Sequence, residues 1–303
     1  MRAGSKPPLA CLPMDIGKVG LWQGVLDQHP SGRVREVVAE LEQMGWPAVW
    51  IPEAVGRDPF VSASVMLEAT STLKVATGIA QIHARHPMTT AAAQKTVAEA
   101  FDNRFLLGIG VSHGPFVEGI RKLDYSKPYS YMVEYLDAMD GAMFMAAGPE
   151  ESPPLVLAAL GPKMLALAAE RTAGAHPYFV PPEHTATARE IMGPDALLAP
   201  EQKVCLETDA EAARALAREN MALYLGLPNY VNNLLRLGFT EQDVAEESDR
   251  LVDAIVAWGD EEAIRARIQA HHDAGADHVA VQVLAPRGEL PLAQWRRLAD
   301  ALL

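Results

Sequence analysis

The sequence contains little cysteine and no long hydrophobic run. It has two cysteines, Cys11 and Cys205, and neither belongs to a CxxC pair of the kind used in redox or metal chemistry. This usage fits a reducing, cytoplasmic location. No run of about 18 apolar residues occurs, so we expect no transmembrane helix. Residues 1–13 lack the apolar segment of a signal peptide, which predicts a flexible tail before one domain over residues 14–303.

Basic residues are also scarce. Lysine and arginine total 26 against 39 aspartates and glutamates, which gives a formal net charge of -13 at pH 7. Such a chain repels polyanions, so we expect a small-molecule substrate and neither nucleic acid nor a membrane as partner. The 303 residues, 49% of them hydrophobic, are enough for one large α/β domain.

A unit of helix, short break and strand recurs along the chain. In its clearest copy, residues 31–51, apolar residues fall on one helical face and Gly45 can take the left-handed position that ends a helix. Residues 48–51 then follow as a strand. Similar units occupy residues 90–110, 163–180 and 260–284, and Asp260 is the expected N-cap of the last.

Alternation of helices and strands predicts a parallel sheet, because parallel neighbours need a long right-handed crossover. Eight such units can close into a (β/α)8 TIM barrel. An open doubly wound sheet is the alternative, but the GxGxxG fingerprint is missing after the first strand. The predicted strands are Val19–Trp22, Ala48–Ile51, Lys74–Ile79, Phe105–Gly110, Leu155–Ala158, Ala175–Phe179, Gln202–Leu206 and His278–Val283.

A long segment separates the last two predicted strands. It holds roughly 70 residues, more than a simple crossover requires. Helical patterning and many acidic residues predict a helical insertion over residues 209–258. A lid, a dimer surface and additional packing are all compatible with it.

The active site of a TIM barrel lies at the carboxyl ends of its strands, and Glu53 follows the second strand there. Pro52 stiffens the approach to this carboxylate. We predict that Glu53 takes part in catalysis by orienting a polar group of substrate, cofactor or catalytic partner. The alternative is a structural ion pair with Arg57 or Arg85.

The fourth strand carries the strongest local signal. It ends in Gly108-Ile-Gly110 and is followed at once by Ser112 and His113. Small residues let a ligand approach the backbone, and an imidazole can exchange a proton near neutral pH. We predict that Gly110 and Ser112 bind a cofactor and that His113 is catalytic. A turn capped by Ser112 with a packed histidine is the alternative.

Three further strand ends supply candidate binding residues. Gly78 within the third strand suggests a bulge or the close approach of a flat ring. His83 follows in a loop with His86 and is a candidate substrate ligand. Acidic and cysteine residues are missing near these two histidines, so we predict no metal site. His176 at the sixth strand is a second candidate substrate ligand, with core packing as its alternative. A helix starting near Gly161-Pro162-Lys163-Met164 could hold a phosphate at its N-terminus.

These motifs, in this order, resemble the bacterial luciferase-like flavin and deazaflavin oxidoreductases, and within them the actinobacterial deazaflavin-dependent branch. The resemblance spans nearly the whole chain. The segments that carry it are Val49–Glu53, Ala76–Ile79, Arg85–Pro87, Arg104–His113, Gly161–Met164 and Ala274–Val279.

The resemblance implies a barrel that binds coenzyme F420, a deazaflavin, or in other branches FMN. It implies a non-prolyl cis peptide between Gly78 and Ile79 behind the cofactor ring, and a phosphate cradle over residues 161–164. His113 stands where some deazaflavin enzymes of the family have a glutamate, so the position matches while the residue type departs from theirs. A homodimer is implied as well.

The function that follows is an oxidoreductase in which F420 exchanges a hydride with a small organic substrate. His113 would move the accompanying proton, and Glu53 would orient His113 or the substrate. An FMN-dependent monooxygenase that uses oxygen and a flavin-binding barrel without turnover are the alternatives.

Overall fold

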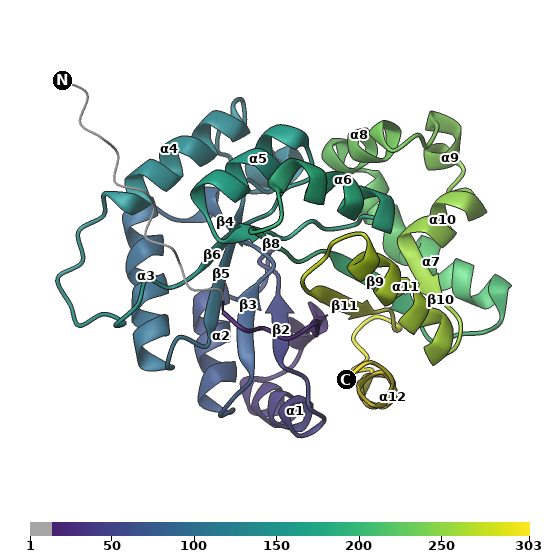
Figure 1. Cartoon of the computed structure of the whole chain (residues 1–303), viewed down its shortest axis with the longest axis horizontal. Helices are drawn as coiled ribbons and strands as arrows, with labels where there is room; N and C mark the ends of the chain where they lie inside the picture. Colours follow the sequence, from purple (N-terminus) through teal and green to yellow (C-terminus); the bar gives the residue numbers. More distant parts are fainter. Residues whose placement is uncertain (1–13) are drawn as a thin grey trace.

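A computed structural model describes residues 14–303, so the predicted tail over residues 1–13 lies outside the described residues. A curled sheet forms the centre of the molecule and helices surround it (Figure 1). Its strands are β1 (Val19–Trp22), β2 (Ala48–Ile51), β3 (Lys74–Thr77), β4 (Ala80–Gln81), β5 (Phe105–Gly110), β6 (Leu155–Leu157), β7 (Gly174–Ala175), β8 (Leu197–Leu198), β9 (Glu201–Cys205), β10 (Val256–Trp258) and β11 (Val279–Val283).

The pairing between these strands is parallel throughout. The sheet order is β10-β9-β11-β1-β2-β3-β5-β6-β7-β8, with β4 also beside β5. Only Ala199 and Pro200 separate β8 from β9. β8 and β9 therefore act as one bulged seventh strand, which pairs with β7 through β8 and with β11 through β9 and so closes the barrel. β10 pairs with the other edge of β9. The predicted TIM barrel is confirmed.

Helices connect nearly every pair of neighbouring strands, as parallel pairing requires. No helix in residues 14–303 is both long and apolar enough to cross a membrane. The α-helices are α1 (Ser31–Gln43), α2 (Pro59–Glu68), α3 (Pro87–Ala100), α4 (Pro128–Asp140), α5 (Pro162–Arg171), α6 (Pro182–Met192), α7 (Ala210–Leu225), α8 (Pro228–Arg236), α9 (Glu241–Ala245), α10 (Asp249–Ile255), α11 (Glu261–Asp273) and α12 (Leu292–Leu302). Short 3-10 helices η1 (Val25–Gln28) and η2 (Ile82–Ala84) and the π-helical η3 (Pro115–Ile120) complete the set.

Local sequence signals account for the helix ends. Gly45 has a φ of +94° after α1, a conformation that costs glycine little. The Asp260 side chain accepts a hydrogen bond from the backbone N–H of Ala263 at 3.0 Å and so caps α11. Both helix ends lie where the sequence predicts them.

Two predicted strands end at least two residues earlier than expected. The third ends at Thr77 because the chain bulges at Gly78 and Ile79 before β4 resumes. The sixth ends at Ala175, since Pro177 has no N–H to donate and Phe179 takes a φ of +61°.

The molecule has separate hydrophobic cores for the barrel and for the insertion. The main core lies between the sheet and the outer helices. A second core joins α7, α8 and α10 to the carboxyl ends of β9 and β11. Figure 1 shows these insertion helices grouped on one side of the barrel. The second core is built from Phe179, Cys205, Ala213, Ala217, Met221, Leu227, Tyr230, Leu234, Phe239, Leu251, Val252, Ile255, Val256 and Leu284.

Candidate active site

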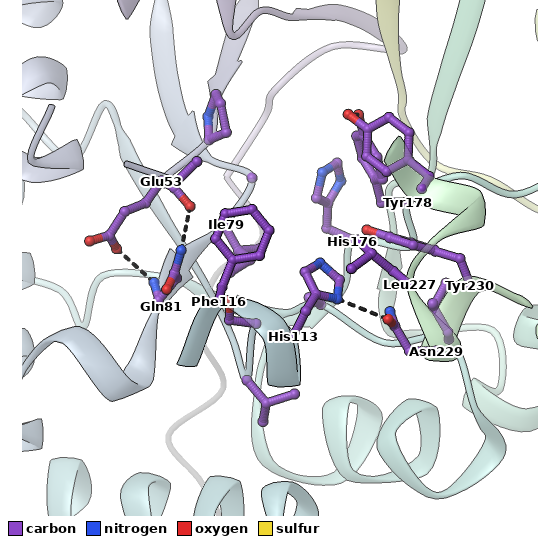
Figure 2. A pocket seen from close by; sticks show the side chains of 18 of the residues that line it. Glu53, Ile79, Gln81, His113, Phe116, His176, Tyr178, Leu227, Asn229 and Tyr230 are labelled. Atoms are coloured by element: carbon purple, nitrogen blue, oxygen red, sulfur yellow. Dashed lines mark hydrogen bonds between the residues drawn. The ribbon is translucent and has the colours of Figure 1, made fainter. Parts of the chain in front are cut away.

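A cavity of about 360 Å³ opens at the carboxyl ends of the barrel strands (Figure 2). Strand ends and the segments that follow them form its floor and part of its side, and the insertion forms the rest. Most lining side chains are apolar or aromatic, the composition expected of a small-molecule site. The lining residues are Trp22, Pro52, Glu53, Ala54, Gly78, Ile79, Gln81, Val111, Ser112, His113, Phe116, Tyr125, Ala158, Ala159, Leu160, Met164, His176, Tyr178, Leu223, Tyr224, Leu227, Asn229 and Tyr230.

The peptide bond between Gly78 and Ile79 is cis, as the family resemblance implied. Its flanking carbonyls are both satisfied: the Trp22 Nε1–H donates to Gly78 O at 3.0 Å, and the Glu53 N–H donates to Ile79 O at 3.1 Å. Gly110 lies directly behind the bulge, because a Cβ there would be 2.8 Å from the Ile79 side chain. Ile79 therefore projects into the cavity over a glycine that leaves room for it.

His113 lies beside this bulge, in the turn after β5. Ser112 has a φ of +62°, and its carbonyl accepts a hydrogen bond from the Tyr125 hydroxyl at 2.8 Å. The imidazole lines the cavity, and its Nδ1 lies 2.9 Å from the Asn229 Oδ1 atom. Burial lowers the pKa of His113, with the Asn229 contact opposing it. The ring is therefore neutral at pH 7 and can exchange a proton.

Glu53 lines the same cavity, but its carboxylate is engaged in an ion-pair network. It accepts hydrogen bonds from the Gln81 N–H at 2.7 Å and from the Arg85 guanidinium at 2.7 and 2.9 Å, and Arg121 lies 3.5 Å away. In Figure 2 the side chain points away from His113. This geometry favours the interpretation of Glu53 as the ion-pair partner of Arg85. A catalytic role for Glu53 stays a prediction.

We expect Glu53→Leu to lower the free energy of unfolding by about 3 kcal/mol, because it leaves the Arg85 charge buried with only Asp58 as partner. The side chains of Glu53 and Arg85 are 6% and 13% exposed. Urea denaturation measures the effect. The matched control is Glu36→Leu, which removes a surface partner of Arg33 that is 66% exposed and should cost less than about 1 kcal/mol. Equal losses in the two variants would contradict a structural role for Glu53.

The predicted phosphate cradle lies at the mouth of the cavity. Gly161 precedes α5, Pro162 is its first residue, and no side chain caps this N-terminus. Met164 lines the cavity, whereas Gly161, Pro162 and Lys163 lie just beyond it. A guanidinium nitrogen of Arg236 approaches from α8, 3.8 Å from where a Cβ on Gly161 would be. An uncapped helix start with a nearby cation is suited to an anion.

The two remaining predicted histidines have different surroundings. His83 is not brought to the cavity: its ring packs behind Tyr125 and Tyr131, with centroids 5.7 and 4.8 Å away. His176 does line the cavity, and its ring stacks on Trp50 at 4.2 Å. Its Nδ1 shares a 2.7 Å hydrogen bond with Ala199 O, and burial lowers its pKa to about 4. His176 is thus a neutral, fixed part of the cavity floor.

A buried polar network supports the wall of the cavity. Lys203, fully buried, donates hydrogen bonds to Glu201 at 3.1 Å and to the Tyr178 hydroxyl and Gln282 at 2.8 Å. The Tyr178 hydroxyl also bonds Tyr224 at 2.7 Å, and burial raises the pKa of Tyr178 well above its usual value. Both rings are therefore fixed against the cavity, and Tyr178 stays protonated. Within residues 14–303, no group of three or more His, Cys, Asp or Glu residues could hold a metal ion.

Several lining residues are not among those predicted from the sequence. Trp22 ends the first strand and could have been found by the strand-end rule that found Glu53. Leu227, Asn229 and Tyr230 belong to the insertion, where no local motif marks a site. Their position over the cavity depends on how α8 packs, which the second core decides.

Two kinds of known protein are similar to this chain. A Mycobacterium tuberculosis protein named "Putative coenzyme F420-dependent oxidoreductase" is 26% identical over 332 aligned residues, which cover 88% of this chain and 96% of that protein. An F420-dependent secondary alcohol dehydrogenase, solved with an F420-acetone adduct, has a TM-score of 0.75 at 15% identity and covers 94% of this chain and 99% of its own.

The second kind binds FMN. The oxygenating constituent of 3,6-diketocamphane monooxygenase from Pseudomonas putida, solved with FMN, has a TM-score of 0.69 at 14% identity, with coverage of 93% and 96%. Both solved structures share the barrel fold of this chain. The model of the family described as luciferase-like monooxygenase matches residues 19–278, from β1 to the residue before β11. The chain belongs to the luciferase-like monooxygenase family.

Proposed function

We propose that this protein is a coenzyme F420-dependent oxidoreductase in which His113 exchanges a proton with a small organic substrate. The observation that carries the proposal is the neutral imidazole of His113 beside the Ile79 bulge, in one largely apolar cavity. The relative named "Putative coenzyme F420-dependent oxidoreductase", which aligns over 88% of this chain, supports the cofactor assignment.

The residues present fit a flat ring with a phosphate tail. A Cβ on Gly78 would come within 2.8 Å of His176 and Trp22, and a Cβ on Gly110 within 2.8 Å of the Ile79 side chain, so the two glycines let the bulge pack closely at the cavity floor. Ile79 would pack against the ring. The uncapped start of α5 at Gly161, with Arg236 beside it, would hold the phosphate.

Each group at the site has a separate task in this proposal. The deazaflavin supplies or accepts a hydride when bound. His113 holds or releases a proton at the substrate. Tyr178 and Tyr224 form a rigid wall that orients the substrate, and Leu227 of the insertion excludes water from above.

An FMN-dependent monooxygenase is the second candidate, favoured by the FMN-bound structure of the same fold. The two functions differ in their use of oxygen. Reduced FMN activates oxygen, whereas reduced deazaflavin reacts poorly with it and carries hydride. Oxygen consumption with reduced cofactor present would favour this second candidate.

Titration of the purified protein with F420, followed by fluorescence, should show saturable binding, while FMN binds weakly or not at all. Arg236→Leu should weaken F420 binding, because it removes the cation beside the uncapped helix start. Arg35→Leu is the matched control: Arg35 is a surface arginine paired only loosely with Glu68, at 3.8 Å. Tight FMN binding without F420 binding would overturn the proposal.

A further inference from the structure

We propose that Asn229 is a positioning residue that selects the tautomer of His113, so that its Nε2 faces the substrate as a proton acceptor. The assignment rests on the proposed function, since it takes His113 to be the proton-exchanging group. It assigns a specific task to the insertion, which carries Asn229 on the first turn of α8.

The contact that carries the inference joins two distant parts of the chain. The Asn229 Oδ1 atom lies 2.9 Å from His113 Nδ1 across a sequence separation of 116 residues (Figure 2). None of the described residues forms a hydrogen bond to the other ring nitrogen, Nε2. One nitrogen is thus occupied by the insertion, and the other is left for a ligand in the cavity that the ring lines.

The surroundings of the ring keep it uncharged. Its aromatic neighbours are Phe116 of η3 and Tyr230 of α8, with centroids 6.2 and 5.2 Å away. Burial raises the pKa of Tyr230 well above 10 and that of Tyr125 to about 12, so both phenols stay neutral. Glu118 on η3 is exposed, and Glu53, which lines the cavity, is paired with Arg85. Burial therefore dominates and lowers the pKa of His113.

A neutral imidazole carries an N–H proton on one of its two ring nitrogens, and the hydrogen-bond partner determines which nitrogen that is. An amide oxygen only accepts hydrogen bonds, so the Asn229 Oδ1 atom requires the proton on Nδ1. Nε2 then has a free lone pair. A hydrogen bond at one nitrogen setting the role of the other is the usual means of fixing a histidine tautomer.

The local structure of α8 holds the Asn229 side chain in place. Pro228 is the first helical residue, where its fixed φ suits the helix start. Tyr230 is buried and makes edge contacts with Phe179 and Tyr224, at centroid distances of 5.4 and 5.6 Å. Asn229 lies between these two anchored residues, so little entropy is lost when it binds His113.

This tautomer prepares His113 to accept a proton during substrate oxidation. A substrate O–H or N–H gives its proton to Nε2, and the adjacent C–H bond breaks with its electron pair leaving as hydride to the oxidised ring of the cofactor. The substrate is oxidised by two electrons and the cofactor is reduced by two. The reverse reaction requires the imidazolium form, which burial disfavours.

The first test needs no substrate. Long-range ¹H–¹⁵N correlation spectra of the protein report which ring nitrogen of each histidine carries the proton, and the His113 signals are identified by their loss in His113→Gln. We expect the Nδ1–H tautomer in the wild type and in Asn229→Asp, and mixed tautomers in Asn229→Leu. A single Nε2–H tautomer in the wild type would overturn the proposal.

The second test uses the pH dependence of kcat/KM for substrate oxidation. Asn229→Asp places a carboxylate on Nδ1, which should raise the pKa of His113 by about 1 or more. On acidification, the neutral, proton-accepting form of His113 is then lost at a higher pH than in the wild type. The acidic limb of the kcat/KM profile therefore moves to higher pH. Asn229→Leu should lower kcat by about 10- to 100-fold, the range typical of a lost orienting contact, with little change in cofactor affinity.

Asn232→Asp is the matched control, because Asn232 lies on the same helix away from the cavity lining and the change is chemically identical. Its spectrum and pH profile should equal those of the wild type. If the protein shows the Nδ1–H tautomer but binds no F420, the role of Asn229 stands and the cofactor assignment is wrong. An Asn229→Asp profile that does not move, in a protein that binds and reduces F420, would reject the role of Asn229 alone.

Discussion

His113→Ala is expected to lower kcat about 10²- to 10⁴-fold while F420 binding remains close to that of the wild type. The variant removes the neutral imidazole that lines the cavity next to the Ile79 bulge. It leaves the bulge and the α5 helix start intact, and these are the places where the ring and phosphate would bind. Steady-state kinetics and fluorescence titration on the same preparation separate the two effects.

His113→Gln is the companion to this variant. A glutamine can still donate a hydrogen bond to Asn229 but cannot exchange a proton near neutral pH. It should therefore be as inactive as the alanine variant while keeping the cavity filled. Turnover at the wild-type level in either variant would remove His113 from the mechanism.

Gly78→Ala is expected to weaken ligand binding about 10-fold or more and to cost about 1 to 3 kcal/mol of stability. A Cβ at this position would lie 2.8 Å from both His176 Nε2 and Trp22 Nε1. Neither ring can move easily: His176 is bonded to Ala199 and stacked on Trp50, while Trp22 donates to Gly78 itself. The backbone must shift instead, and Ile79 shifts with it.

Gly32→Ala provides the control for Gly78→Ala. Gly32 lies in α1, and a Cβ there would meet nothing within 4 Å. Alanine favours the helix, so this variant should be neutral or slightly more stable. Thermal unfolding and F420 titration of both variants test the prediction. Wild-type affinity in Gly78→Ala would show that the cavity floor tolerates a side chain.

The fold could be predicted because its signals are local and repeated. The apolar face of α1, with Val37 and Leu41 both fully buried, followed by Gly45 and a short apolar strand, is a pattern visible in one unit. Repetition of that unit requires parallel pairing. Because the sites of such barrels lie at strand ends, the sequence also suffices to predict that His113 and Glu53 line the cavity.

The parts that could not be predicted depend on contacts between distant segments. Arg57 and Arg85 were both possible ion-pair partners of Glu53, and only the folded chain shows that Arg85, 32 residues away, binds its carboxylate. Asn229 follows His113 by 116 residues, on a helix whose position is set by packing. His83 follows the third strand as expected, but η2 turns its ring behind Tyr125. Hydrophobic periodicity predicts the helix or strand to which a residue belongs, but it does not predict side-chain contacts between distant segments.

The separate core of the insertion has a consequence for how this enzyme can diversify. Leu223, Leu227 and Tyr230 form the roof of the cavity, and Leu227 and Tyr230 pack in the second core rather than in the main core. Substitutions there can reshape the pocket without altering the residues of the main core. New specificities can arise in the roof without compensating changes in the barrel.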